Sequence, residues 1–152
     1  MPDNPVAKAD LPLRNKFVWA AVALGGGFGA MLRFFWNKLF TEINTAFPLA
    51  QFTENIAGAF VLGWLLAIFI KRRGKHRYIR SFFGTGLIGS FTTFSGITTE
   101  MNEFLGLGIY STDVTEFVLT DLMLFAGYPL ISILCGLAAA WAGFLAGRKT
   151  RK

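Results

Sequence analysis

The sequence predicts an all-α membrane protein with four transmembrane helices, the third of them broken, and three observations lead to this class. Hydrophobic residues fill 53% of the 152 positions and charged residues only 16%, which is too apolar for the surface of a soluble domain of this size. At about 20 apolar positions for each crossing, the chain holds material for about four spans. The 17 glycines agree, because glycine lets membrane helices approach closely.

The spans follow one another in a single transmembrane domain. The first two have the length of a crossing, and each ends in polar or charged residues. The third contains GTGLIGSFTTFSGITT, poor material for a simple lipid-facing helix. A cleaved signal peptide over the first 23 residues is an alternative for the first span, but apolar sequence continues to Leu32. We expect spans at about 17–36, 48–70, 82–99 and 122–146 of a domain over 1–152.

The positive charges are distributed unevenly along the chain. Four crossings place both termini on one side of the membrane, and thirteen of the fifteen lysines and arginines fall in the segments on that side. By the positive-inside rule we expect cytoplasmic termini, and we expect the chain in the cell (inner or plasma) membrane. Topology or anionic lipid accounts for these cations, so no nucleic-acid partner is expected. They are Lys8, Arg14, Lys16, Lys71, Arg72, Arg73, Lys75, Arg77, Arg80, Arg148, Lys149, Arg151 and Lys152.

No enzyme is indicated by the residues that could carry catalysis. Cys135 is the only cysteine and His76 the only histidine, so an internal disulfide and a multi-Cys or multi-His metal site are excluded. A serine or cysteine nucleophile needs a base. His76 lies in the basic loop, far in depth from Ser95 and Cys135.

Polar side chains within the spans are candidates for function, because they are costly at membrane depth. In the first span, Gly26, Gly29 and Ala30 form a small-residue stripe that ends in Arg33. In the second, Gln51, Glu54, Asn55 and Gly58 share one helix face. Arg33 and Glu54 lie at a similar outer depth, and we expect them to pair.

The third span carries Thr92, Thr93 and Ser95 around Phe94, among closely spaced glycines. Two interpretations remain open from the residues alone. Either the helix breaks and its freed carbonyls bind a cation, or the segment is a tightly packed helix whose hydroxyls bond their own backbone. In the fourth span, Tyr128, Ser132 and Gly136 are spaced by four on one face, which is a weak signal by itself.

Three segments carry a family resemblance: GGGFGAMLRF (25–34), NIAGAFVLG (55–63) and GLIGSFTTFSGITTE (86–100). In this order they resemble the Fluc, or CrcB, family of fluoride channels. The resemblance implies a passive, fluoride-selective channel that exports fluoride from the cytoplasm. It also implies an antiparallel dimer with two narrow pores along its interface, and a structural sodium ion at its centre.

The same resemblance assigns roles to individual residues. Backbone carbonyls of Gly89 and Thr92 would hold the sodium ion. Amide and hydroxyl donors can replace the water around fluoride, and a phenylalanine ring edge can face an anion. The implied pore residues are Asn55, Phe94, Ser95, Ile97, Tyr128 and Ser132, with Arg33 and Glu100 near the pore mouths or helix ends. The polar face of the second span adds Gln51 and Glu54 as structural or vestibule residues.

Several features of this chain depart from the family pattern. Ile97 stands where the TTFSTF motif has a second phenylalanine, and Gly96 replaces the threonine before it. The charge bias favours one orientation, so the dimer partner is either a second copy or an oppositely oriented paralogue. Two further alternatives are a proton-coupled exporter of small cations that uses Glu54, and a nonconducting, diverged subunit of a heterodimeric channel.

Overall fold

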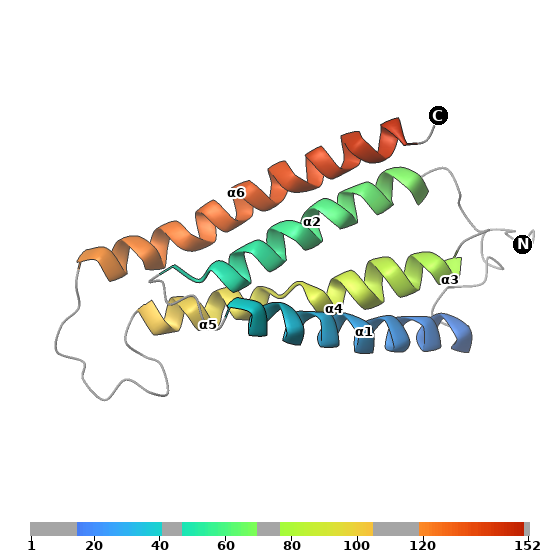
Figure 1. The fold of residues 1–152 in the computed structure, drawn as a ribbon, viewed down its shortest axis with the longest axis horizontal. Helices are drawn as coiled ribbons and strands as arrows, with labels where there is room; N and C mark the ends of the chain where they lie inside the picture. The colour runs from blue at the N-terminus through green and yellow to red at the C-terminus, as the bar shows by residue number, and fades with distance from the viewer. Residues whose placement is uncertain (1–14, 41–46, 70–76, 105–118, 151–152) are drawn as a thin grey trace, which may run out of the picture.

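The computed structural model describes residues 15–40, 47–69, 77–104 and 119–150, with side chains of the last range from Met123 onward. Every element in these ranges is helical and none is a strand, so the predicted all-α class is confirmed there. Figure 1 shows the helices running along one common direction. They are α1 (Lys16–Phe40), α2 (Leu49–Phe69), α3 (Arg77–Arg80), the wider π-helix η3 (Ser81–Ile88), α4 (Gly89–Phe91), α5 (Phe94–Phe104) and α6 (Leu119–Lys149).

Three of the described helices are long and apolar enough to cross a membrane: α1, α2 and the Met123–Lys149 part of α6. At 1.5 Å per residue, the 21 residues of α2 extend about 31 Å, which matches a hydrocarbon core of about 30 Å. Large apolar side chains such as Leu39 and Trp141 are exposed along these helices. These features identify a multi-pass membrane protein. The segment expected as the third span is built from the shorter helices α3 to α5.

Glycines bring α1 and η3 into backbone contact. A Cβ at Gly25 would meet the Phe82 carbonyl, and one at Gly29 would meet the Leu87 carbonyl. The expected stripe began at Gly26, but a Cβ there would lie at an ordinary 3.7 Å from Ser90 Oγ. The close contact therefore follows a Gly-xxx-Gly spacing one residue earlier than expected, as in other tightly packed membrane helices.

A second pair, α2 and α6, packs in the same way. Gly63 lies against the Ala140 carbonyl of α6, and Gly143 lies against the Phe60 carbonyl of α2. The two helices run side by side over most of their length in Figure 1. The fold thus contains two glycine-mediated pairs, α1 with η3 and α2 with α6.

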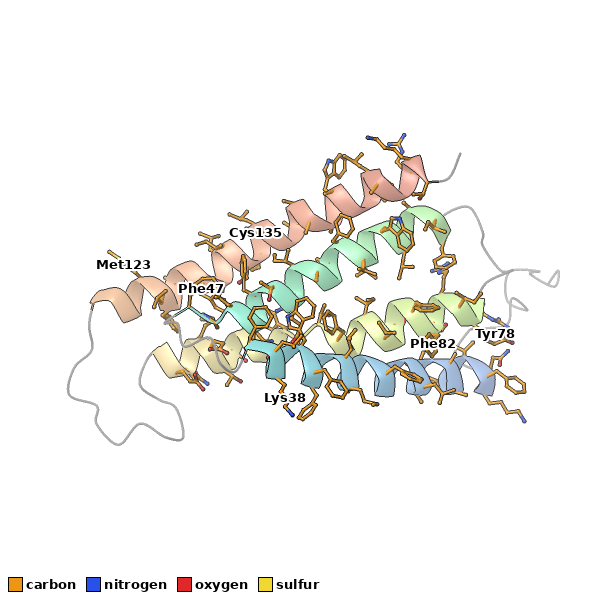
Figure 2. All side chains as sticks on the ribbon, in the orientation of Figure 1. Lys38, Phe47, Tyr78, Phe82, Met123 and Cys135 are labelled. Carbon is orange, nitrogen blue, oxygen red and sulfur yellow. The ribbon has the colours of Figure 1, made fainter. Side chains whose placement is uncertain are left out.

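The described cations gather mainly at one end of the molecule. The start of α1, the start of α3 and the end of α6 lie at the same end in Figure 1. Asn15 Nδ2 donates to the Tyr78 hydroxyl at 3.1 Å across this end. Lys38 lies away from this end and points outward (Figure 2). The end carries Lys16, Arg77, Arg80, Arg148 and Lys149. Lys8, Arg14, Lys71, Arg72, Arg73, Lys75, His76, Arg151 and Lys152 lie outside the described residues.

Candidate functional site

The candidate site surrounds an interruption between α4 and α5. Thr92 has an extended backbone, with φ −78° and ψ 151°, so helical geometry stops there and resumes at Phe94. The Thr92 hydroxyl donates to the Ile88 carbonyl at 2.9 Å. Gly58 of α2 faces the interruption, because a Cβ at this position would meet Thr92 Cγ2. With any larger residue at position 58, α2 could not approach the interruption this closely.

Asn55 of α2 satisfies the backbone at the interruption. Thr93 N–H donates to Asn55 Oδ1 at 3.0 Å, and Asn55 Nδ2 donates to the Thr93 carbonyl at 3.2 Å. Both polar groups of one peptide residue are therefore bound by one side chain. Irregular backbone at membrane depth is tolerated only where protein or a cavity supplies such partners.

Two carbonyls at the interruption lose the donors that a continuous helix would give them. The N–H four residues after Gly89 belongs to Thr93, which donates to Asn55 instead. The N–H four residues after Thr92 belongs to Gly96, which donates to Thr93 Oγ1 at 3.2 Å. Carbonyl oxygens released in this way are suitable ligands for a sodium ion. The geometry of Gly89 and Thr92 thus fits the cation expected from the sequence.

The first turn of α5 is capped by its own residues. Thr93 is the N-cap, since its hydroxyl accepts from the third helical N–H, that of Gly96. The hydroxyls of Thr93 and Ser95 lie 2.8 Å apart in a hydrogen bond. Phe94 is 72% exposed and Ser95 is also exposed. Ile97 is buried, so the two positions of the family's phenylalanine pair face different surroundings in this chain.

Tyr128 and Ser132 lie deep between α6 and its neighbours. Tyr128 is only 1% exposed, and Ser132, one helical turn later, is also buried. Its ring packs edge-on against Phe47, with centroids 5.5 Å apart. Figure 2 shows Phe47 between the start of α2 and α6. The carboxyl groups of Glu100 and Glu54 both act electrostatically on the phenol, so α2, α5 and α6 contribute to one polar region.

Glu54 is fully buried beside α1. Asn37 Nδ2 donates to Glu54 Oε2 at 3.0 Å and to the Arg33 carbonyl at 2.9 Å. The Arg33 charge interacts favourably with the carboxylate, but the hydrogen bond comes from Asn37. The expected direct pair of Arg33 and Glu54 is therefore not formed. Asn37 connects the two residues instead, through the Glu54 carboxyl group and the Arg33 carbonyl. Glu54 Oε1 is buried without a hydrogen-bond donor.

Gln51 reaches from α2 to the first turn of α5. Its side chain occupies the place that a Cβ at Gly96 would take, with Nε2 the nearest atom. Gln51 is 8% exposed, and its Nε2 is buried without a hydrogen-bond acceptor. The Gln51 amide thus fills the space that is left because Gly96 has no side chain.

The structure divides the expected site residues into two groups. Asn55, Phe94 and Ser95 lie at the interruption with the carbonyls of Gly89 and Thr92. Tyr128 and Ser132 lie with Glu54 and Glu100 in the polar region to which α2, α5 and α6 contribute. Sequence reasoning missed Asn37, although its position four residues after Arg33 places both on one face of α1.

Comparison with known proteins gives the same family over most of the chain. The family described as "CrcB-like protein, Camphor Resistance (CrcB)" matches residues 20–144. A fluoride-specific ion channel FluC of Paracoccus denitrificans is 34% identical over 88% of this chain and 96% of its own length. One from Azobacteroides pseudotrichonymphae is 34% identical over 82% of this chain and 90% of its own length.

A third relative, fluoride-specific ion channel FluC 3 of Streptomyces avermitilis, is 36% identical over 88% of this chain. The match spans 60% of that relative's length. With the family match extending over residues 20–144 and relatives at this level of identity, the chain belongs to the CrcB family.

Proposed function

We propose that this chain forms a passive, fluoride-selective ion channel that exports fluoride from the cytoplasm. The observation that carries the proposal is the interrupted helix held by Asn55, in a chain similar to proteins named fluoride-specific ion channels. A packed helix has no free donors for an ion. An interruption beside amide and hydroxyl groups supplies them where the membrane would otherwise exclude a small anion.

The chemistry of the residues near the interruption suits fluoride. Fluoride is small and strongly hydrated, so its water must be replaced by N–H and O–H donors such as those of Asn55 and Ser95. The Phe94 ring offers a positive edge without a full charge. Tyr128 and Ser132 would continue this path along α6. Neutral groups favour conduction, because an ion bound by full positive charges leaves slowly.

The pathway in this proposal lies between two copies of the chain or between the chain and an oppositely oriented paralogue. Phe94 and Ser95 face outward from the single chain, beside the exposed residues Thr98 and Thr99 of the same helix. A polar helix face is a poor surface for lipid. An antiparallel dimer would cover this face on both subunits and create two narrow pores along the interface.

A structural sodium ion at the dimer centre is part of the proposal. The carbonyls of Gly89 and Thr92 would hold it, because the N–H groups that a continuous helix would offer them donate elsewhere. When bound, the ion would stabilise two interrupted helices against each other by binding carbonyl oxygens that the interruption separates from their helical N–H donors.

The proposed location is the cell membrane, with both termini in the cytoplasm. Five of the described cations lie at one end of the molecule, and the positive-inside rule places that end in the cytoplasm. Anionic lipid would contact the same end. This fixed orientation favours an oppositely oriented paralogue as partner, and this chain could be a diverged, nonconducting member of such a pair.

A second candidate function rests on Glu54. A fully buried carboxyl group within a membrane protein is a common element of proton-coupled transport, so a proton-coupled exporter of small cations is the alternative. This candidate does not account for the interruption at Thr92 and Thr93, because cation export does not require an interrupted helix there.

Liposomes containing the purified chain separate these candidates. A fluoride electrode should record fluoride efflux that chloride does not match, with no uptake of organic cations along a proton gradient. Cation uptake without fluoride efflux would replace the first proposal by the second. Fluoride efflux that requires a co-expressed paralogue would identify a heterodimer.

A further inference from the structure

The buried amide of Gln51 fills the space at Gly96, but its N–H group has no hydrogen-bond partner in the packing described so far. Its Nε2 is buried and lacks a hydrogen-bond acceptor, and burying an N–H donor without an acceptor is costly. Such an exception calls for a specific explanation. Gln51 lies one helical turn before Asn55, so both amides project from the same face of α2.

An acceptor for this amide is available nearby but is not used. Glu54 Oε1 lies on the same helix three residues later and is itself buried without a donor. The two groups do not bond to each other. Instead, the Gln51 side chain points to α5, where its Nε2 is the atom nearest to the position that a Cβ at Gly96 would take.

The position that the amide reaches favours a negative charge. Gly96 is the third residue of α5, an 11-residue helix that begins after the interruption. The N-terminal turn of a helix carries a partial positive charge and attracts anions. The Gln51 amide, the second amide on this face of α2 after that of Asn55, therefore brings an N–H donor to a helix end that attracts a negative ion.

We propose that Gln51 is a fluoride-binding residue: its amide occupies the space that Gly96 leaves, and its N–H donates to a desolvated fluoride ion at the first turn of α5. The inference rests on the proposed function, and it adds one residue to the path beyond Asn55, Phe94 and Ser95. Gly96 acts as a positioning residue, because any side chain there would displace the amide.

The test uses the full purified chain and two measurements. One is fluoride efflux from liposomes. The other is the rise in melting temperature that fluoride causes in detergent, relative to chloride at equal concentration, because a bound ligand stabilises the folded state. Gln51→Met keeps the length of the side chain and removes the donor. We expect it to weaken fluoride affinity about tenfold to a hundredfold, the loss of one hydrogen bond to an anion, and so to reduce both fluoride responses.

Thr53→Val is the matched control on the same helix. Thr53 Oγ1 donates to the Leu49 carbonyl and accepts from Trp36 Nε1, away from α5. This variant should keep both fluoride responses. Parental responses in Gln51→Met would overturn the inference.

Two further variants separate binding from packing. Gly96→Ala should displace the amide and weaken both fluoride responses. The double variant Gln51→Ala with Gly96→Ala relieves the crowding and should restore the melting temperature without fluoride. If the double variant also recovered the fluoride responses, Gln51 would be a packing residue only. These two variants decide the matter even if Gln51→Met does not fold.

The two readouts distinguish failure of the inference from failure of the proposed function. Fluoride efflux by both the parent and Gln51→Met would refute the inference and leave the channel intact. A fluoride-dependent stabilisation of the parent that Gln51→Met loses, without efflux, would support the binding residue and refute the channel. A parent with neither response would refute both.

Discussion

Asn55 binds both backbone groups of Thr93: it accepts from the N–H at 3.0 Å and donates to the carbonyl at 3.2 Å. One side chain on α2 thereby holds open the interruption that begins α5. The geometry makes Asn55 a support for the backbone as well as a candidate ion ligand, and the two roles respond differently to substitution.

Replacing Asn55 by Asp keeps the acceptor for Thr93 N–H and removes the donor to its carbonyl, while adding a negative charge that repels fluoride. We expect Asn55→Asp to lower fluoride efflux by at least about tenfold, equivalent to about 1.4 kcal/mol. Asn55→Leu also leaves the N–H without its side-chain acceptor and should unfold at a lower temperature, because each buried unsatisfied group costs about 1–3 kcal/mol. Liposome efflux and thermal melts measure the two effects. Parental efflux by Asn55→Asp would remove Asn55 from the path.

Phe94 contributes little to folding of the single chain, because 72% of it is exposed. Phe94→Ile should therefore fold normally and slow fluoride efflux sharply, since the ring edge that faces the anion is lost. Phe17 is a matched control at 62% exposure on α1, remote in sequence from the interruption. Phe17→Ile should leave efflux unchanged. Equal efflux by Phe94→Ile and the parent would show that the ring does not contact the ion.

Glu54 separates anion transport from cation transport. Glu54→Gln retains an acceptor for Asn37 and removes a negative charge from the protein interior. Fluoride efflux should be maintained or increased, whereas a proton-coupled exporter would lose its activity. Asn37→Leu should lower the melting temperature, because the hydrogen bond to Glu54 is worth about 1.5–3 kcal/mol when the carboxyl is charged. Loss of fluoride efflux in Glu54→Gln would contradict the anion interpretation.

The glycines of α1 offer a paired test of helix packing. Gly29→Ala places a Cβ against the Leu87 carbonyl, so α1 and η3 must separate and the melting temperature should fall. Gly27→Ala places its Cβ in open space, and alanine favours helix over glycine by about 1 kcal/mol. That variant should be neutral or more stable. Equal melting temperatures for the two variants would argue against the close contact.

Removal of sodium tests the carbonyls at the interruption. Replacing sodium by a large organic cation should lower the melting temperature and the fluoride efflux together, because the Gly89 and Thr92 carbonyls would lose the ion that they bind. Returning sodium should restore both, and potassium serves as the control for ionic strength. Stability that is independent of the cation would remove sodium from the proposal.

Helix length and apolar content were sufficient to predict α1, α2 and α6 from the sequence, and the family motif located Asn55 and Phe94. The rotation of each helix about its axis was not predictable in the same way. One residue around a helix is a turn of about 100°, which separates the observed contact at Gly25 from the expected stripe at Gly26. The bond from Asn37 to Glu54 depends instead on position along the helix axis, because Asn37 shares a face of α1 with Arg33 but lies one turn, about 6 Å, further along.

The contact between Gln51 and Gly96 constrains the order in which these positions change during evolution. Any side chain gained at position 96 meets the amide from α2 while Gln51 is present. A lineage that gains a side chain at this position must therefore also shorten residue 51 or turn its amide away. Sequences intermediate between the two arrangements should pair a small residue at 51 with glycine at 96, and the reverse combination should be rare.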